Sequence, residues 1–270
     1  IGLIGLGNMG RATLQRFVAV DGMEIAALCD LSRHNVERAT QLLALAGAQN
    51  PKQAPSVFLH WTDVCRSADV DLVVVCTDWQ SHTPIAVEAM KRGKHVAIEV
   101  PAAMTVADCW TLVDTAERTR RHCIMLENCC YDPFQLMTLG MVREGLLGEI
   151  THCEGAYIHD LREQFNADEA HGGYHKRWMS RYTEQHQGNP YPTHGLGPIC
   201  QLLDIHRGDR MTYLVSLSSD IRYEQRGHDI AENHINNTLI RTARGRSILI
   251  QYDVTTPRPY SRLQTVCGTR

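Results

Sequence analysis

The feature that most constrains the fold is a glycine-rich turn near the start of the chain, Gly5-Leu6-Gly7-Asn8-Met9-Gly10. The apolar residues before it predict a buried strand, and residues 11–17 after it predict a helix. Each glycine has an expected role: Gly5 makes a tight turn, Gly7 lets a pyrophosphate approach the backbone, and Gly10 lets helix and strand pack closely. This order predicts a dinucleotide site with the phosphates at the amino end of the helix.

A second apolar run, residues 24–29, ends in Asp30, twenty residues beyond Gly10. A carboxylate at this point accepts hydrogen bonds from an adenosine ribose and repels the 2′-phosphate of NADP, which favours NAD. Arg33 keeps NADP open as an alternative, because its guanidinium would either stack on adenine or meet a phosphate.

Composition narrows the class of protein. With 270 residues, 43% of them hydrophobic, the chain exceeds one typical domain, so two domains with real cores are expected. A net charge of -3 gives no basic footprint, and nucleic acid is not an expected partner. No apolar run approaches the roughly 20 residues that span a bilayer, so no membrane partner is expected either.

The cysteines and histidines suggest neither a disulfide framework nor a metal centre. The ten cysteines include no CxxC pair and are predicted to be buried thiols. His171 and His175 are four residues apart, but Gly172 and Gly173 between them predict a loop rather than a ligand-bearing helix, so no metal is expected. The chain begins inside a predicted strand, so an upstream segment, with any signal peptide, is expected to be missing from view.

Residues 1–128 alternate between apolar runs and helical patterns. Strands are predicted over 57–60, 71–76, 95–99 and 123–127, and helices over 35–44, 85–92 and 106–120. Pro84 is predicted to open the second of these helices and Gly93 to end it. Units of this length imply right-handed crossovers and a doubly wound parallel sheet, the α/β Rossmann domain that binds NAD.

Ligands of doubly wound sheets bind at the carboxyl ends of the strands. Trp79, His82, Glu99 and Asn128 fall at such ends and are candidates to surround the nicotinamide half of the cofactor. The complete set of predicted cofactor-binding residues is Gly5, Gly7, Asn8, Met9, Gly10, Asp30, Trp79, His82, Glu99, Val100 and Asn128.

The pattern changes in residues 129–270. After a helix predicted over 134–144, strands are predicted over 149–157, 213–219, 234–241 and 247–253, and they no longer alternate with helices. They predict a second, α+β domain with an open, predominantly antiparallel sheet. Residues 161–189 are polar, rich in glycine and histidine and without periodicity, which predicts a long functional loop.

Tyrosines and histidines gather at the ends of elements in this second domain. Tyr157 and His159 are two apart in a strand and share one face, while Tyr191 and His194 precede a helix predicted over 196–205. Oxidation of a sugar hydroxyl requires a base for its proton, and histidine titrates near neutrality, so His194 or His159 fits that role. For each of these residues taken alone, the alternative is a core or rim side chain with its hydrogen bonds satisfied and no catalytic role.

Five stretches, spread over most of the chain, carry a resemblance to a known family. They are Glu127-Asn128-x-Cys130-Tyr131, Met141-Val142-Arg143-x-Gly145-Leu146-x-Gly148-Glu149, Tyr157-x-His159-Asp160-Leu161-Arg162, Tyr191-Pro192-Thr193-His194-Gly195-Leu196-Gly197-Pro198 and Pro257-Arg258-Pro259-Tyr260-Ser261. The chain resembles the Gfo/Idh/MocA oxidoreductase superfamily, and within it glycoside hydrolase family 109, the NAD-dependent α-N-acetylgalactosaminidases.

This resemblance implies hydrolysis without net redox change: transient oxidation at C3 of the sugar by NAD, elimination across C1 and C2, water addition and re-reduction. Such enzymes stand outside the two-carboxylate mechanism of most glycosidases. The resemblance places catalytic or sugar-contacting groups at Glu127, Tyr157, His159, Tyr191 and His194, with further substrate contacts at Pro192, Thr193 and Tyr260. We expect His194 to take the hydroxyl proton and Tyr157 the C2 proton.

Two departures from related sequences bear on specificity. Dehydrogenases of the superfamily have Glu-Lys-Pro, with a catalytic lysine, where this chain has Glu99-Val100-Pro101, which fits the glycosidase branch. Where the family has a sugar-contacting arginine, this chain has Met179, with Arg177 and Arg181 nearby as possible substitutes. The family's sequences continue past the position of Arg270, so the carboxyl end here is expected to be incomplete.

The expected function is therefore an NAD-dependent glycosidase, and an NAD(P)-dependent sugar or polyol dehydrogenase is the alternative. A nucleotide-binding sensor without turnover is a third. The exposed face of the second sheet predicts a homo-oligomer. Location stays open between the cytoplasm, which the scattered thiols favour, and export of the folded protein, which the resemblance implies.

Overall fold

The computed structural model describes residues 1–45, 54–168, 171–186, 188–219, 223–225, 228–230 and 235–270. These residues form two compact units, Ile1–Leu126 and Glu127–Arg270, each with its own core. Within the described residues, no helix combines the length and the apolar character that crossing a membrane requires.

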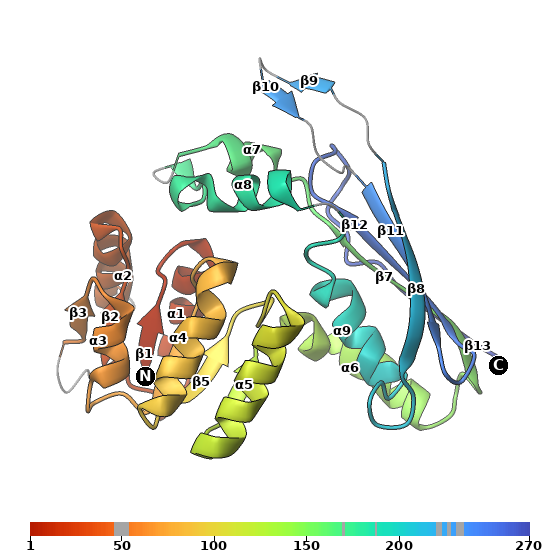
Figure 1. The fold of residues 1–270 in the computed structure, drawn as a ribbon, viewed down its shortest axis with the longest axis horizontal. Helices are drawn as coiled ribbons and strands as arrows, with labels where there is room; N and C mark the ends of the chain where they lie inside the picture. Colours follow the sequence, from red (N-terminus) through yellow and green to blue (C-terminus); the bar gives the residue numbers. More distant parts are fainter. Residues whose placement is uncertain (46–53, 169–170, 187, 220–222, 226–227, 231–234) are drawn as a thin grey trace. The chain divides into compact units, whose positions relative to one another are not determined.

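The first unit is a six-stranded parallel sheet in the order β3-β2-β1-β4-β5-β6 (Figure 1). Its strands are β1 (Gly2–Ile4), β2 (Ala27–Cys29), β3 (Ser56–Phe58), β4 (Leu72–Val75), β5 (His95–Ile98) and β6 (Cys123–Met125). Its helices are α1 (Asn8–Val18), α2 (Arg33–Leu45), α3 (Trp61–Arg66), α4 (Trp79–Lys91) and α5 (Val106–Thr119). The order reverses at β1, which confirms the predicted doubly wound fold.

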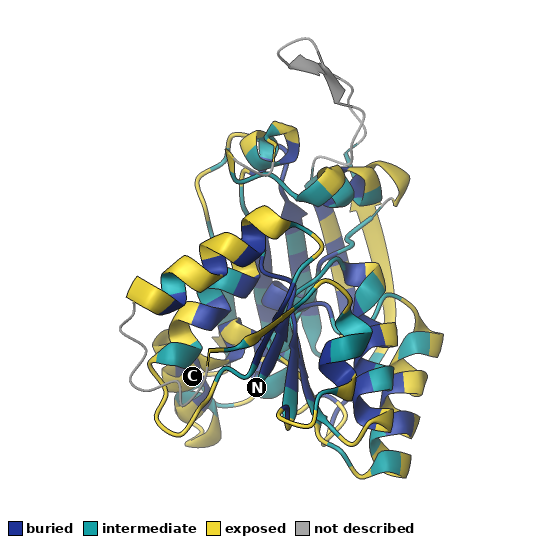
Figure 2. Ribbon diagram, turned by 90° about the vertical axis from the view of Figure 1, so that its left-hand side faces the viewer, coloured by how far each residue is buried: buried dark blue, intermediate teal, exposed yellow. Residues whose placement is uncertain are grey.

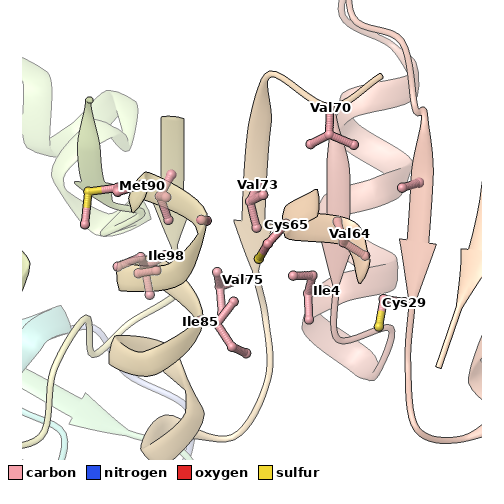
Figure 3. Packing of buried hydrophobic residues seen from close by; sticks show 14 of the residues in the cluster. Ile4, Cys29, Val64, Cys65, Val70, Val73, Val75, Ile85, Met90 and Ile98 are labelled. Atoms are coloured by element: carbon pink, nitrogen blue, oxygen red, sulfur yellow. The ribbon is translucent and has the colours of Figure 1, made fainter. Parts of the chain in front are cut away.

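Helices cover both faces of this sheet because successive residues of each strand point to opposite sides. Val73 and Val75 of β4 pack with α3, α4 and α5, and Figure 3 shows this layer with Cys65 and Ile85 beside them. Val74 points the other way, into the cluster formed with α1 and α2. Both sides of β4 are thus buried, as its unbroken run of branched residues predicts.

The predicted start of α4 is wrong. The helix begins at Trp79 rather than after Pro84, because Asp78 caps it: its Oδ1 accepts from the Ser81 backbone N–H at 3.1 Å and its Oδ2 from the Ser81 hydroxyl at 2.8 Å. Pro84 lies inside the helix, and a strong cap outweighs the preference of proline for the first turn. The predicted end at Gly93 is confirmed, with φ at 82°.

The second unit is built on a five-stranded sheet in the order β13-β7-β12-β11-β8. Its strands are β7 (Ile150–Ile158), β8 (Met211–Ser218), β11 (Ile235–Thr242), β12 (Ser247–Asp253) and β13 (Gln264–Gly268), with a separate pair of β9 (Tyr223–Gln225) and β10 (His228–Ile230). Only β7 and β12 run parallel among the five, so the predominantly antiparallel sheet is confirmed. Strand β13 was not predicted.

One face of this sheet carries the core. Figure 1 shows α6 (Pro133–Arg143) and α9 (Thr193–Leu202) on this face, and Ile199 packs against Ile248 and Cys153. Figure 2 shows the general pattern, with dark blue strands inside and yellow outward faces on the helices. Each fully buried aliphatic residue here contributes stability that truncation to alanine would reduce by about 2–5 kcal/mol.

The segment predicted as a loop over 161–189 contains helical structure, so that prediction is only partly right. It forms α7 (Arg162–Asn166), a 3-10 turn η3 (His175–Arg177) and α8 (Trp178–Gln185). The apolar side chains of Phe165 and Met179 are buried and supply the hydrophobic contacts that the polar composition concealed. All ten cysteines are free thiols, but Cys109 and Cys267 are exposed rather than buried.

Candidate active site

The glycine turn of the first unit has the geometry that its sequence predicts. Gly5 has a φ of 89°, and Cβ atoms built on Gly5 and Gly10 would overlap the Cys76 and Gly5 carbonyl oxygens. A Cβ on Gly7 would meet nothing within 4 Å, so open space lies where the backbone enters α1. The exposed Asn8 and Met9 begin that helix. This arrangement fits a dinucleotide pyrophosphate held by helix N–H groups.

Asp30 joins the second strand to the glycine turn. Its Oδ2 accepts from the Leu6 backbone N–H at 2.6 Å, and its Oδ1 accepts from the Ser32 backbone N–H at 2.7 Å. Each carboxylate oxygen can accept more than one hydrogen bond, so these contacts leave capacity for ribose hydroxyls. Asp30 thus shapes the turn as well as offering a negative charge, a role that the sequence pattern did not predict.

Other predicted cofactor residues lie at the carboxyl ends of the strands of this unit. His82 is fully buried and its Nδ1 lies 2.8 Å from the Pro101 carbonyl oxygen, so it braces the segment after β5. Burial lowers its pKa, so the ring is neutral and donates from Nδ1. Trp79 and Val100 are buried and Glu99 is half-buried. Their contact with a nicotinamide stays a prediction.

In the second unit, Glu127 and His194 form a buried pair. Glu127 caps the short 3-10 helix η1 (Asn128–Tyr131), and its Oε1 accepts from the Cys129 backbone N–H at 3.0 Å. The same oxygen accepts from His194 Nδ1 at 2.7 Å, with both side chains less than a tenth exposed. Because Nδ1 carries the proton, Nε2 of His194 is left as the basic nitrogen.

The hydrogen bonds decide the charge of this pair. Burial alone would raise the pKa of the Glu127 carboxyl, but the hydrogen bonds from His194 and Cys129 outweigh it and lower the pKa below its ordinary value. Glu127 is therefore ionised, and its Oε2 is buried with no hydrogen-bond partner among the residues that the structure describes. A buried carboxylate bound to imidazole orients the ring and favours its protonation during a reaction.

Glu127, Cys129 and His194 also offer one ligand atom each within 4.8 Å, the spacing of a metal site. The contacts of these three residues fit a shared proton between His194 and Glu127 better than a bound metal ion. The proton on Nδ1 is already shared with Glu127, and burial raises the pKa of the Cys129 thiol to about 12, which keeps the sulfur protonated. Metal ligands require a deprotonated thiol.

A second pair, Tyr157 and His159, lies beside the first. The Tyr157 hydroxyl is 3.1 Å from His159 Nδ1, and the Tyr157 ring centroid is 5.2 Å from that of His194. Tyr191 contacts both Tyr157 and His194 at 5.1 and 4.9 Å between centroids, and Tyr260 contacts His159 at 5.0 Å. Five residues predicted from separate stretches thus gather in one cluster.

Small residues make this cluster possible. A Cβ on Gly155 would overlap the Gly195 carbonyl oxygen, so the first turn of α9 lies directly on β7. This close approach brings His194 to Tyr157, two residues along the same face of the strand. A Cβ on Gly197 would lie 3.0 Å from Glu127 Cγ, so η1 approaches α9 as closely.

The remaining predicted residues surround this cluster less directly. Pro192 and Thr193 are half-buried at the start of α9, and Asn128 is exposed on η1. Met179 is buried, while Arg177 donates from Nε to the Phe165 carbonyl oxygen at 3.1 Å, and Arg181 is exposed. These contacts do not identify either Arg177 or Arg181 as a sugar-binding residue.

Sequence reasoning missed Arg262. Its Cζ lies 4.3 Å from the centroid of the Tyr157 ring, and its Nε donates to the Tyr260 hydroxyl at 2.6 Å. The available signal was its position directly after the stretch Pro257-Arg258-Pro259-Tyr260-Ser261. A basic residue two places after an aromatic one points to the same side of an extended chain.

The two units define a class of protein: an NAD-binding Rossmann domain followed by an open-sheet domain that carries acid–base residues. Residues 1–127 match the oxidoreductase family with an NAD-binding Rossmann fold, and residues 131–270 match the C-terminal domain of glycosyl hydrolase 109. The chain belongs to glycosyl hydrolase family 109. The predicted family, fold class, NAD cofactor and class of enzyme, a glycosidase, are confirmed.

Curated relatives agree over the whole chain. It is 56% identical to "Glycosyl hydrolase family 109 protein 2" of Phocaeicola vulgatus, covering 100% of this chain and 68% of that protein. It is also 56% identical to an "Alpha-N-acetylgalactosaminidase" of Bacteroides fragilis, covering 100% of this chain and 66% of the relative. The chain thus spans about two thirds of the length of these relatives.

Solved structures show the same fold at low sequence identity. Myo-inositol 2-dehydrogenase from Lactobacillus plantarum superposes with a TM-score of 0.79 and 15% identity, over 99% of this chain and 73% of that one. Myo-inositol dehydrogenase from Lactobacillus casei, solved with NAD(H) and myo-inositol, gives 0.76 and 21% identity over 99% and 70%. At these identities the likeness describes the fold alone.

Proposed function

We propose that this chain hydrolyses α-linked N-acetylgalactosaminides by a mechanism of oxidation, elimination, water addition and re-reduction. The observation that carries the proposal is the contact between two proton-transferring pairs, Glu127–His194 and Tyr157–His159. The name of the Bacteroides fragilis relative supports the substrate class. A conventional glycosidase uses two carboxylates, whereas Glu127 in this cluster is engaged with an imidazole.

The residues suited to hold the cofactor are those of the glycine turn and Asp30, because they leave room at Gly7 and present N–H groups and a carboxylate. Bound NAD would supply a reversible two-electron acceptor, so that oxidation at C3 early in the cycle is reversed by reduction at its end. Retention of the cofactor between these steps is part of the proposal.

Two bases with different surroundings divide the proton transfers. His194 Nε2 takes the proton of the C3 hydroxyl, and the ionised Glu127 stabilises the resulting imidazolium. Tyr157 takes the proton from C2, which a neighbouring C3 ketone acidifies, and the aglycone leaves from C1. His159 Nδ1 accepts the phenol proton and restores Tyr157 as a base. The same groups return protons when water adds.

The alternative function is a sugar or polyol dehydrogenase, which the match of residues 1–127 to the NAD-binding oxidoreductase family favours. Incubation with aryl α-N-acetylgalactosaminide, with and without NAD, discriminates the two. We expect aglycone release at a steady rate, no accumulation of NADH, and loss of activity in Tyr157→Phe. NADH growth in step with substrate loss, without aglycone release, would establish the dehydrogenase.

We also propose that the chain forms a homo-oligomer through the second sheet. Tyr213, Val215 and Leu217 of β8 point to the face opposite the core and are 62%, 66% and 75% exposed, next to Leu239 of β11. Such a contiguous apolar face favours association with a second copy. Val215→Glu is expected to lower the molar mass measured by light scattering, whereas Val113→Glu, on the exposed side of α5, is not. An unchanged mass in both would contradict this interface.

A further inference from the structure

Arg262 brings a positive charge against the proposed C2 base. Its Cζ lies 4.3 Å from the centre of the Tyr157 ring and 5.1 Å from that of Tyr260. Its Nε donates to the Tyr260 hydroxyl at 2.6 Å, which fixes the plane of the guanidinium. A cation over an aromatic face is attracted by the ring's negative potential, more strongly when water is excluded.

The charge of Arg262 is not neutralised by a carboxylate. In the described part of the chain, Arg162, Arg246 and Arg258 each meet an aspartate within 4 Å, whereas Arg262 forms no ion pair. Its Nη1 is buried and has no hydrogen-bond partner within the described segments. A buried donor left unpaired is costly, and such groups persist where they serve a site.

The groups around Tyr157 show why a cation matters there. Its neighbours are the tyrosines Tyr174, Tyr191, Tyr252 and Tyr260, together with His159 just after β7, Cys129 on η1 and His194 on α9. Burial raises the pKa of Tyr157 above its ordinary value, and among the described residues the charge of Arg262 acts in the opposite direction and lowers it. Without Arg262, this surrounding would oppose any phenolate.

We propose that Arg262 stabilises the phenolate of Tyr157 and thereby enables it to remove the C2 proton, while its bond to Tyr260 holds that ring against His159. The proton leaves Tyr157 Oη for His159 Nδ1, and the half-buried His159 passes it to solvent from Nε2. The phenolate charge, which is delocalised over the ring, then lies beneath the guanidinium. Arg262 acts here as a positioning residue. Its effect on catalysis rests on the proposed function, in which Tyr157 is the base that removes the C2 proton.

The first test needs no substrate. A fluorinated tyrosine, whose phenol ionises in an accessible pH range, is placed at position 157, and its titration is followed by fluorine NMR. In Arg262→Gln we expect the midpoint to rise by about one pH unit, a tenfold change in the ionisation constant, and in Arg262→Lys to rise less. Arg258→Gln is the matched control, since Arg258 lies in the same segment but bonds Gln251 and Asp253.

Equal midpoints in Arg262→Gln and in the unsubstituted protein would overturn the proposal, and so would an equal shift in the Arg258→Gln control. The kinetic test is the pH dependence of kcat for aryl glycoside hydrolysis. We expect the acid limb to move upward by a similar interval in Arg262→Gln and to be partly restored in Arg262→Lys. A raised KM with an unmoved limb would mean that Arg262 binds substrate instead. Full activity in Tyr157→Phe would refute the proposed function while leaving the NMR result valid.

Discussion

Replacement of Glu127 by glutamine isolates the charge of the buried pair. Both donors, the His194 Nδ1–H and the Cys129 backbone N–H, bind the same oxygen, Oε1, so a glutamine carbonyl in that position satisfies both. The change therefore retains both of these hydrogen bonds and removes the negative charge, while the amide N–H₂ takes the buried position of Oε2. Hydrogen bonds to a charged group contribute about 1.5–3 kcal/mol and neutral ones about 0.5–1.5, so the imidazolium loses about 1–1.5 kcal/mol. That difference corresponds to a roughly tenfold fall in kcat.

Glu127→Ala is the companion variant. It leaves the Cys129 N–H and the His194 Nδ1–H buried without an acceptor, so we expect a fall in kcat of about 100-fold or more and a loss of stability of about 2 kcal/mol or more. The assay is aglycone release at saturating NAD, with thermal unfolding measured in parallel. Equal kcat in Glu127→Gln and the unsubstituted protein would refute the assignment of this pair as the base.

The same carboxyl makes stability depend on pH. Its pKa in the folded protein is lowered by the hydrogen bonds from His194 and Cys129 against the opposing effect of burial. A depressed folded-state pKa contributes stability that is present above the ordinary carboxyl pKa and is lost as the pH falls through the folded value. Glu127→Gln should therefore unfold with a weaker dependence on pH in the acid range.

Three further changes test separate parts of the structure. Asp30→Ala removes the acceptor of the Leu6 N–H and a negative charge, and should weaken NAD binding about 10- to 100-fold by fluorescence titration; unchanged affinity would separate the carboxylate from the cofactor site. Gly155→Ala forces a Cβ into the Gly195 carbonyl and should destabilise the second unit by about 1–3 kcal/mol in urea, whereas Gly140→Ala, with open space, should not. Dialysis against a chelator should leave hydrolysis unchanged. If the dialysed protein were inactive and only added zinc restored its activity, Glu127, Cys129 and His194 would bind a metal ion rather than share a proton.

The first unit was the more predictable because its signals are local. The glycine turn and the branched run of β4 act within a few residues, and the expected tight turn at Gly5 and close packing at Gly10 are seen, while the approach of a pyrophosphate to Gly7 stays a prediction. The start of α4 was mispredicted because two local signals compete there, and the Asp78 cap is stronger than Pro84. The hydrogen bond from the Leu6 backbone N–H to Asp30 could not be predicted, because a sequence pattern does not show how close these two residues lie in the fold.

The second unit depends on contacts between distant residues. The tyrosine and histidine stretches identified the residues of the cluster in advance. These residues come together because Gly155 of β7 lies against Gly195 of α9, and this contact is visible only in the folded structure. Arg262 escaped notice because a single arginine in a polar segment is ordinary on a surface. Its unusual state, with no carboxylate partner among the described residues, becomes visible only when its neighbours are known.

The two histidines of the cluster, His194 on α9 and His159 just after β7, have different surroundings. His194 is buried and donates from Nδ1 to the Glu127 carboxylate, whereas burial and the nearby Arg262 lower the pKa of His159 and favour its neutral form. Groups whose surroundings push their protonation apart are suited to different roles in one cycle. In the proposed mechanism, the neutral His159 accepts the phenol proton of Tyr157 while His194 retains the hydroxyl proton for its return. In the proposed cycle, Arg262 therefore acts on the proton transfer at Tyr157, whose ring lies 4.3 Å from its Cζ.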